Sequence, residues 1–221
     1  MDSTLHDEPN QVAEMIDRAL RSIGTSLPGN VISFDPGPPQ RVEVQPGIQM
    51  EVNVPGLPAL KNLPKVVNVP LVIPFGSTAG FGLTVPIMAG DPVLLIFSQR
   101  AIDNWVDFGG VQPPEGGVSS RHHHLTDAFA ILMPSPTSAG AFGEWDLDGL
   151  TIRNRDKTQF VRVRDADVIA TAGSSILTLN KDGSGSLACP SGLTLSQDTT
   201  INGDLQVNGN INATGTITPG S

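Results

Sequence analysis

Three consecutive histidines and a nearby aspartate are the residues of this sequence whose types could do chemistry: His122, His123, His124 and Asp127. Imidazole nitrogens bind divalent metals and titrate near neutral pH, so the histidines are weak candidates for metal ligands or a general base. Adjacent residues in a strand point to opposite faces, and three in a row therefore cannot converge on one ion within a chain. A three-fold axis could gather one histidine from each of three chains. We interpret the segment that carries these histidines as a polar turn, and we predict no metal site and no cofactor.

The remaining sequence lacks the motifs of the common enzyme classes. The patterns GxSxG and HExxH are absent, and no kinase-like set of motifs occurs. The glycine-rich stretch from Gly76 to Gly82 is followed by neither a lysine nor a helical pattern, so we interpret it as a connection and not as a phosphate-binding loop. The single cysteine, Cys189, excludes an internal disulfide, and we expect it to be a small buried hydrophobic residue. We therefore predict no catalytic residues and no enzymatic activity.

The composition favours a mainly β protein. Hydrophobic residues make up 38% of the chain, and its 24 glycines and 19 prolines are typical of strands and turns. The formal net charge of −9 argues against a nucleic acid partner, because phosphate binding needs a basic face. No apolar run is long enough to span a bilayer, and the N-terminus lacks the pattern of a secretory signal. We therefore expect a soluble protein that is not conventionally exported.

The sequence indicates one helix, near the N-terminus. Residues 7–23 carry apolar side chains at helical spacing, with charged residues on the other face. The apolar positions are Val12, Met15, Ile16, Ala19, Leu20 and Ile23. We expect Asp7 to cap this helix and Gly24 to end it. The apolar stripe could pack on the protein's own domain or dock on a neighbouring subunit, and the sequence leaves both open.

Residues 29–134 are predicted to form a small OB-like barrel, because short β-prone runs are broken there by proline and glycine. The runs are VISFD, QRVEVQ, IQMEVNV, VVNVPLVIPF, LTVPIM, DPVLLIFSQ and WVDFGG. Prolines cannot donate to a strand ladder, so Pro70, Pro74 and Pro86 should lie at edges, bulges or corners of a partly open barrel. The most apolar run, Gly90 to Phe97, is predicted to be its central strand.

The last third of the chain changes to strands with one polar face, and then to a short repeat. Apolar and polar residues alternate in short stretches around Leu150, Val161 and Ile176. From Ile201 to Ile217 it governs every position, with apolar residues or glycine at odd positions and Asn, Asp, Gln or Thr at even positions. A period of six is superposed, in the hexapeptides NGDLQV, NGNINA and TGTITP. Repeats of this kind imply that the repeating units stack on one another.

This tail cannot hold an ordered fold alone, because its few apolar side chains bury too little surface to offset the entropy lost on ordering. Three copies wound around a common axis would pair their backbones and share an interior. The predicted trimer core is Leu193, Leu195, Ile201, Leu205, Val207, Ile211 and Ile217. A single-chain left-handed β-helix is the weaker alternative, because three hexapeptides make only one coil. A collagen-like rod is excluded, because glycine does not recur at every third position.

The order of these features resembles the central spike proteins at the baseplate tip of contractile-tailed phages and related contractile injection systems, including R-type pyocins. The resemblance covers the N-terminal helix, the small barrel, the segment RHHHLTDAFAILMPSP and the final INGDLQVNGNINATGTI. We accordingly expect a helix and lead-in at 1–28, an OB-like barrel at 29–134, a neck at 135–149, and an intertwined triple-stranded β-helix needle at 150–221.

In that family the barrel seats the spike on the hub at the end of the tail tube, and the trimeric needle breaches the outer membrane when the sheath contracts. The resemblance therefore implies a homotrimer at the tail baseplate tip of a virion, assembled in the host cytoplasm. It further implies binding to a baseplate hub protein and transient contact with a bacterial outer membrane.

The sequence departs from the family pattern in two respects. Many members carry a His-x-His pair near the tip that holds an iron ion, but no histidine follows His124 here, so a separate tip-capping protein is an open alternative. The stretch from Ser135 to Gly149 is too short for the lysozyme domain that some spikes carry.

The competing function is a trimeric receptor- or polysaccharide-binding tail fibre component. Such a fibre should show aromatic residues and paired carboxylates, whereas the last aromatic residue here is Phe160.

Overall fold

The structure of the protein is a computed structural model that describes residues 8–21, 23–54, 57–76, 80–114, 121–137 and 143–217. It divides into two compact units, Met1–Phe142 and Gly143–Ser221. Strands predominate in both units, and the mainly β class expected from the composition is confirmed.

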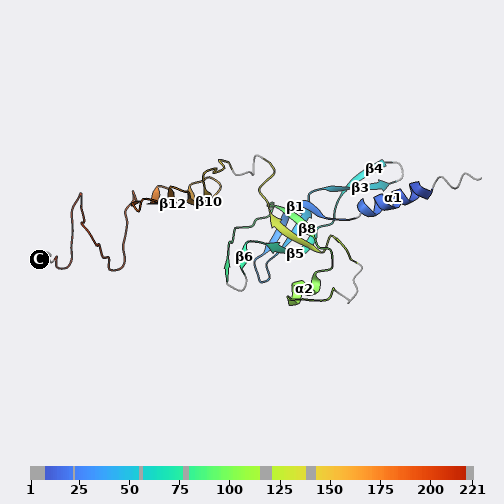
Figure 1. Ribbon diagram of the computed structural model, residues 1–221, viewed down its shortest axis with the longest axis horizontal. Helices are drawn as coiled ribbons and strands as arrows, with labels where there is room; N and C mark the ends of the chain where they lie inside the picture. Colours follow the sequence, from blue (N-terminus) through green and yellow to red (C-terminus); the bar gives the residue numbers. More distant parts are fainter. Residues whose placement is uncertain are drawn as a thin grey trace, which may run out of the picture. The chain divides into compact units, whose positions relative to one another are not determined.

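Five strands of the first unit close into a small barrel in the order β1-β2-β5-β9-β8 (Figure 1). Their bounds are Ser26–Asp35 for β1, Arg41–Pro46 for β2, Val66–Val72 for β5, Ala128–Leu132 for β9 and Pro92–Phe97 for β8. Neighbouring strands are antiparallel, except for the parallel pair β5 and β9. The predicted barrel is thus present, but it is closed and not partly open. Because a closed barrel has no central strand, the run predicted as the central strand forms β8, which lies between β1 and β9.

The core of the barrel consists of inward side chains that alternate along its strands. In β2 and β8 every second residue is buried, as period-two geometry requires of strands with one face on a core. The buried hydrophobic residues are Val31, Val42, Val44, Val66, Val69, Val93, Leu95, Phe97, Ala128 and Ala130. β-Branched valines dominate this set, which suits a narrow pleated interior.

Two small hairpins accompany the barrel. One pairs β3 (Gln49–Val54) with β4 (Leu57–Asn62), and the other pairs β6 (Phe75–Gly76) with β7 (Phe81–Gly82). The predicted glycine-rich connection falls in the second hairpin, although residues 77–79 lie outside the described residues. The run LTVPIM at residues 83–88 was predicted as a strand, but it has no strand hydrogen bonding. Pro86 sits within it and has no N–H to donate.

The described residues of the first unit form two helices. The predicted N-terminal helix is confirmed as α1 (Glu8–Arg21), while its expected cap, Asp7, lies outside the described residues. The second, α2 (Asp103–Phe108), falls where WVDFGG was predicted as a strand, so that prediction is wrong. An aspartate stands in its first turn, and Gly109 ends it with a positive φ of 66°. Among the described helices, none has the length and apolar character needed to cross a membrane.

The second unit contains a five-stranded antiparallel sheet in which each strand pairs with the next along the chain (Figure 1). The strands are β10 (Leu150–Arg153), β11 (Gln159–Val163), β12 (Asp167–Ala172), β13 (Ser175–Asn180) and β14 (Gly185–Ala188). The predicted strands around Leu150, Val161 and Ile176 are confirmed. Residues 189–217 contain no strand within the single chain, so the triple-stranded needle and the trimer stay predictions.

Candidate functional site

One face of the sheet from β10 to β14 is apolar along two rows that run across all five strands. Strand register places Leu150, Val163, Val168, Leu179 and Gly185 in one row, and Ile152, Val161, Ala170, Leu177 and Leu187 in the other. We call these ten residues the apolar face. Its eight large side chains are 37–72% exposed in the single chain. Exposed apolar area of this extent is typical of an interaction surface.

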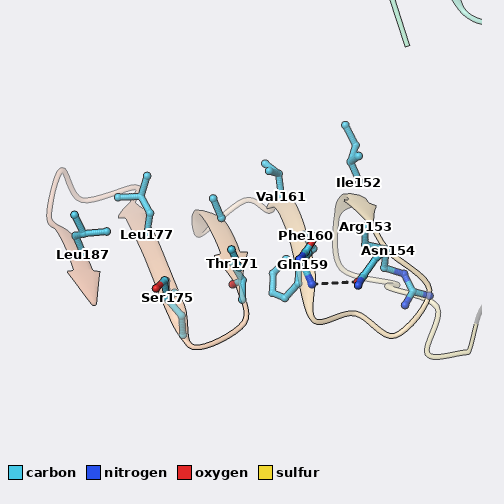
Figure 2. Close-up of a pocket in the computed structure, with 13 residues that line it drawn as sticks. Ile152, Arg153, Asn154, Gln159, Phe160, Val161, Thr171, Ser175, Leu177 and Leu187 are labelled. Carbon is cyan, nitrogen blue, oxygen red and sulfur yellow. Dashed lines mark hydrogen bonds between the residues drawn. The ribbon is translucent and has the colours of Figure 1, made fainter. Parts of the chain in front are cut away.

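A shallow groove of about 520 Å³ lies on the same sheet. Figure 2 shows Ile152, Val161, Leu177 and Leu187 along one side of the strands, and all four line the groove. Its lining is mostly carbon, and the groove is open to solvent. It therefore resembles an uncovered packing surface more than an enclosed site for a small polar ligand.

The opposite face of this sheet is polar near its start, where Thr151 and Arg162 lie side by side on β10 and β11. The hydroxyl of Thr151 donates to the Asp146 carboxylate at 2.9 Å, and the N–H of Asp148 donates to it at 3.1 Å. Together with the nearby Arg162 guanidinium, these hydrogen bonds hold the pKa of Asp146 below its usual value. Farther along the sheet the same face carries Phe160, Ile169 and Ile176, so this face is polar only near its start.

A second ion pair closes the turn between β11 and β12. Arg164 Nε donates to Asp167 Oδ1 at 2.9 Å, and a second guanidinium nitrogen reaches Oδ2. This contact lowers the pKa of Asp167 and raises the pKa of Arg164. The turn between β11 and β12 is thus stabilised by contacts within the chain.

The seven predicted trimer-core residues all lie exposed in the single chain. Leu193, Leu195, Ile201, Leu205, Val207, Ile211 and Ile217 have exposed fractions between 42% and 67%. They occur in a segment without intrachain strand pairing. Cys189, expected to be buried, is only half-buried at the start of this segment.

The structure separates the three histidines that the sequence singled out. Arg100 Nη1 donates to His122 Nε2 at 3.1 Å, whereas His124 Nδ1 lies 2.8 Å from the hydroxyl of Thr126. His123 has a left-handed backbone with φ 49°, and its N–H donates to the Ser98 carbonyl. In the described part of the chain, no group of three or more His, Cys, Asp or Glu side chains is placed to hold a metal ion.

Asp127 does not join the histidines, and instead anchors the loop that carries α2. Its side chain is 1% exposed, and Oδ1 accepts from Arg121 Nη2 at 3.0 Å and from the Ile102 N–H at 3.2 Å. Arg121 also donates to Asp103, the first residue of α2. We call Arg121, Asp103 and Asp127 the loop anchor. Sequence reasoning missed it, because Asp103 and Arg121 are far apart in the sequence and follow no motif spacing.

Two further apolar surfaces are exposed on the first unit. On α1, Val12, Met15 and Ile16 are each more than half exposed, so the predicted stripe is not covered by the described residues. On α2, Trp105 packs edge to face on Phe129 with ring centroids 5.8 Å apart, but Phe108 points outward and is 76% exposed. Both surfaces could contact a partner protein.

Comparison with known proteins points to a phage protein family. Residues 27–133, which contain α2 and all of the barrel strands except the first residue of β1, match the family described as Phage protein Gp138 N-terminal domain. No curated protein matches the chain. The family match is consistent with a phage structural protein.

Proposed function

We propose that this protein is the trimeric central spike of a contractile phage tail or tailocin, seated on the baseplate hub, and that it pierces the host outer membrane when the sheath contracts. One observation carries the proposal. Seven apolar side chains alternate with polar ones along residues 193–217, yet all seven are exposed and no strand pairing within the chain orders the segment. Such a segment gains order only when other chains pair with its backbone and cover its apolar side.

The first unit is suited to attachment. Its barrel is the part that matches a phage protein family, and the exposed stripe of α1 together with Phe108 supplies apolar surface for a partner. We assign these surfaces to the baseplate hub, because one end of a spike must bind the tail while the thin end leads. The Arg121–Asp127 contact keeps α2 in a fixed position for such docking.

The needle acts mechanically and without catalysis in this proposal. Residues 205–221 contain no ionisable side chain, which lowers the barrier to entering a hydrocarbon layer. Work comes from the contracting sheath, and the chain contributes a stiff, internally hydrogen-bonded point. Consequently neither a metal nor a cofactor has a role in this scheme.

The experiment that tests the proposal is the solution mass of the purified full chain. Sedimentation equilibrium should give three times the chain mass of 23.2 kDa over a wide range of concentration. A monomer would contradict the proposal. Incubation of the trimer with host surface polysaccharide should release no oligosaccharide, whereas release would favour a polysaccharide-degrading fibre.

A further inference from the structure

The tail contains the only two Asn-Gly pairs of the sequence, Asn202-Gly203 and Asn208-Gly209. An asparagine that precedes glycine loses its side-chain amide readily, because glycine has no side chain to hinder attack by its backbone nitrogen and its backbone is the least restricted of all residues. All four residues are exposed, and each pair lies in a bend of the chain. The tail therefore presents two chemically reactive sites of the same kind, one in each of two successive hexapeptides.

The local structure leaves the reacting groups accessible to each other. Residues 189–217 contain no strand within the single chain, so strand pairing does not fix the backbone around either pair. Asn208 Oδ1 lies 3.5 Å from Gln206 Nε2, a contact too long to restrain the amide strongly. Apart from the adjoining residues, no described atom lies within 4 Å of the place where a side chain on Gly209 would begin. Approach to the Gly209 nitrogen is thus unobstructed.

The reaction at such a pair needs only water. The backbone nitrogen of Gly209 attacks Cγ of Asn208 and forms a new C–N bond, and the bond from Cγ to the side-chain amide nitrogen breaks. That nitrogen leaves as ammonia and takes up the proton that the Gly209 nitrogen loses. Water then opens the resulting five-membered imide at either carbonyl. One opening gives aspartate, and the other gives isoaspartate, in which the main chain runs through the former side chain and is one carbon longer. The same steps apply to Asn202 and Gly203.

An extended backbone opposes this reaction. Ring closure requires rotation about ψ of the asparagine until the next backbone nitrogen faces Cγ, whereas a strand holds ψ at about +135°. In the proposed needle, neighbouring chains pair with the tail and keep residues 201–217 extended. We therefore expect the reaction to be confined to chains that have not assembled.

The isoaspartate product is the one that damages the repeat. Strand geometry places alternate residues on opposite faces, and an extra main-chain carbon breaks this alternation for every residue that follows. After conversion at Asn208, Ile211 and Ile217 would no longer meet their counterparts in partner chains. Conversion also adds a negative charge to a segment that has no ionisable side chain after Asp204.

We propose that Asn202 and Asn208 are sites of spontaneous deamidation in the unassembled chain, and that their conversion to isoaspartate excludes aged chains from assembly. The second half of the inference rests on the proposed trimeric needle. The reactivity of the two asparagines follows from their sequence neighbours and local structure, so it can be tested separately.

The reactivity is tested on the full chain with the tail's own controls. Dissociated chains in denaturant and native protein are incubated in parallel at mildly alkaline pH, and each asparagine is followed by mass spectrometry of proteolytic peptides. Asn210 and Asn212 are the matched controls, because isoleucine and alanine follow them in the same tail. In dissociated chains we expect Asn202 and Asn208 to react faster than the controls by about tenfold or more, and in native protein to be slowed by a similar factor.

Two outcomes of this assay would overturn the inference. Similar rates at all four asparagines of the dissociated chain would show that the Asn-Gly pairs are not reactive sites. Equal rates at Asn202 and Asn208 in trimeric and dissociated protein would show that assembly does not protect them. A native chain that sediments as a monomer would instead overturn the proposed function, and the rates in the dissociated chain would still decide the reactivity.

The effect on assembly is tested by returning aged, dissociated chains to native buffer and separating trimer from unassembled chain. We expect isoaspartate at positions 202 and 208 to be depleted from the trimer by about tenfold relative to the unassembled fraction. The same ratio is measured in the two fractions from expressing cells, which does not depend on refolding. Equal isoaspartate content in both fractions would overturn the exclusion of aged chains.

Two double variants separate the altered backbone from the added charge. Asn202→Asp with Asn208→Asp introduces both charges on an unaltered main chain, and freshly made protein should assemble normally. Asn202→Gln with Asn208→Gln keeps both amides but would require a larger and less favourable ring, so ageing should leave its assembly yield unchanged. If the aspartate variant fails to assemble, charge and not the isoaspartate backbone excludes aged chains. If the glutamine variant loses assembly on ageing as fast as the unaltered chain, the two sites are not the cause.

Discussion

Leu177 and Leu187 are directly opposed on β13 and β14, on the same face of the sheet, and remain 40% and 53% exposed. A cross-strand pair of leucines contributes to a sheet mainly when a third layer covers it. No residue of the described chain supplies that layer. The pair therefore marks an apolar surface that is uncovered in the single chain, as we expect if the proposed trimer covers it.

The first prediction concerns the inner face of the tail. Leu205→Asp or Ile211→Asp would place three carboxylates around one axis, and each buried charge without a partner costs several kcal/mol, on the order of 3–5. We expect both variants to fail to form trimers in sedimentation equilibrium. Asn210→Asp is the matched control on the polar face, and it should assemble normally. Equal behaviour of the control and the inner-face variants would contradict the assigned alternation.

The second prediction concerns attachment through α1. Met15→Gln combined with Ile16→Gln removes apolar surface that is already exposed, so the protein should stay folded and trimeric. Binding to purified hub protein from the same particle, measured by calorimetry, should weaken at least tenfold, which is about 1.4 kcal/mol. Gln11→Ala, on an exposed residue of the same helix, should bind as the unaltered protein does. Deleting residues 1–24 should have the same effect as the double variant, whereas normal binding of that truncated chain would show that α1 does not contact the hub.

The third prediction concerns the stability of the second unit at low pH. The folded-state pKa values of Asp146 and Asp167 are both lowered, so these carboxylates stabilise the sheet above the unfolded-state pKa of about 3.9, and the stabilisation is lost as pH falls through their folded-state values. Thermal unfolding of the second unit should therefore shift to lower temperature between pH 6 and pH 2.5. Thr151→Val removes the main hydrogen bond to Asp146 and should reduce the dependence on pH. Thr151→Ser keeps the hydroxyl and should retain it, and no difference between the two would exclude this hydrogen bond as the cause.

The fourth prediction concerns the loop anchor. Asp127→Ala removes the buried partner of Arg121, which keeps its contact with Asp103, and leaves the Ile102 N–H without its acceptor; the free energy of unfolding of the barrel unit should fall by about 1–3 kcal/mol. Asp107→Ala is the matched control, because Asp107 is exposed and its pairing with Arg41 is long at 3.6 Å. Removal of such a surface pair should cost at most about 1 kcal/mol. Denaturant unfolding of the two variants provides the comparison, and similar losses would contradict the anchor.

The barrel and the strands of the second unit were predictable because their alternation follows directly from burial on one face. The strand prediction for WVDFGG failed for a different reason. Val106 and two aromatic residues favour a strand locally, but the Ile102 N–H contact with Asp127 and the left-handed Gly109 set a helix there. The parallel pairing of β5 with β9 brings together residues far apart in sequence, and no local pattern encodes it. The alternation of the tail could be recognised in the sequence, but residues 189–217 form no strand within the single chain, so the triple-stranded needle stays a prediction.

The last prediction concerns the uncharged tip. A point driven through a membrane meets hydrocarbon, where each unpaired charge raises the barrier and internally paired backbone raises it much less. Asn212→Lys and Thr216→Lys together add six charges to a trimer on the polar face, where they should not disturb assembly. If the C-terminus leads, killing or infection should fall while the yield of assembled particles stays unchanged. Asn212→Gln with Thr216→Ser alters the same positions without charge, and activity should be retained.

The competing explanation for the uncharged tip is a separate capping protein, which would make the lack of charge a property of a protein interface. Mass spectrometry of purified particles distinguishes the two, because a cap would appear as an additional small protein that is lost from the lysine variant. With no such protein present, a fall in activity at full assembly supports a bare leading tip. Unchanged activity of the lysine variant would refute it, because a charged point would then cross the membrane as readily as an uncharged one.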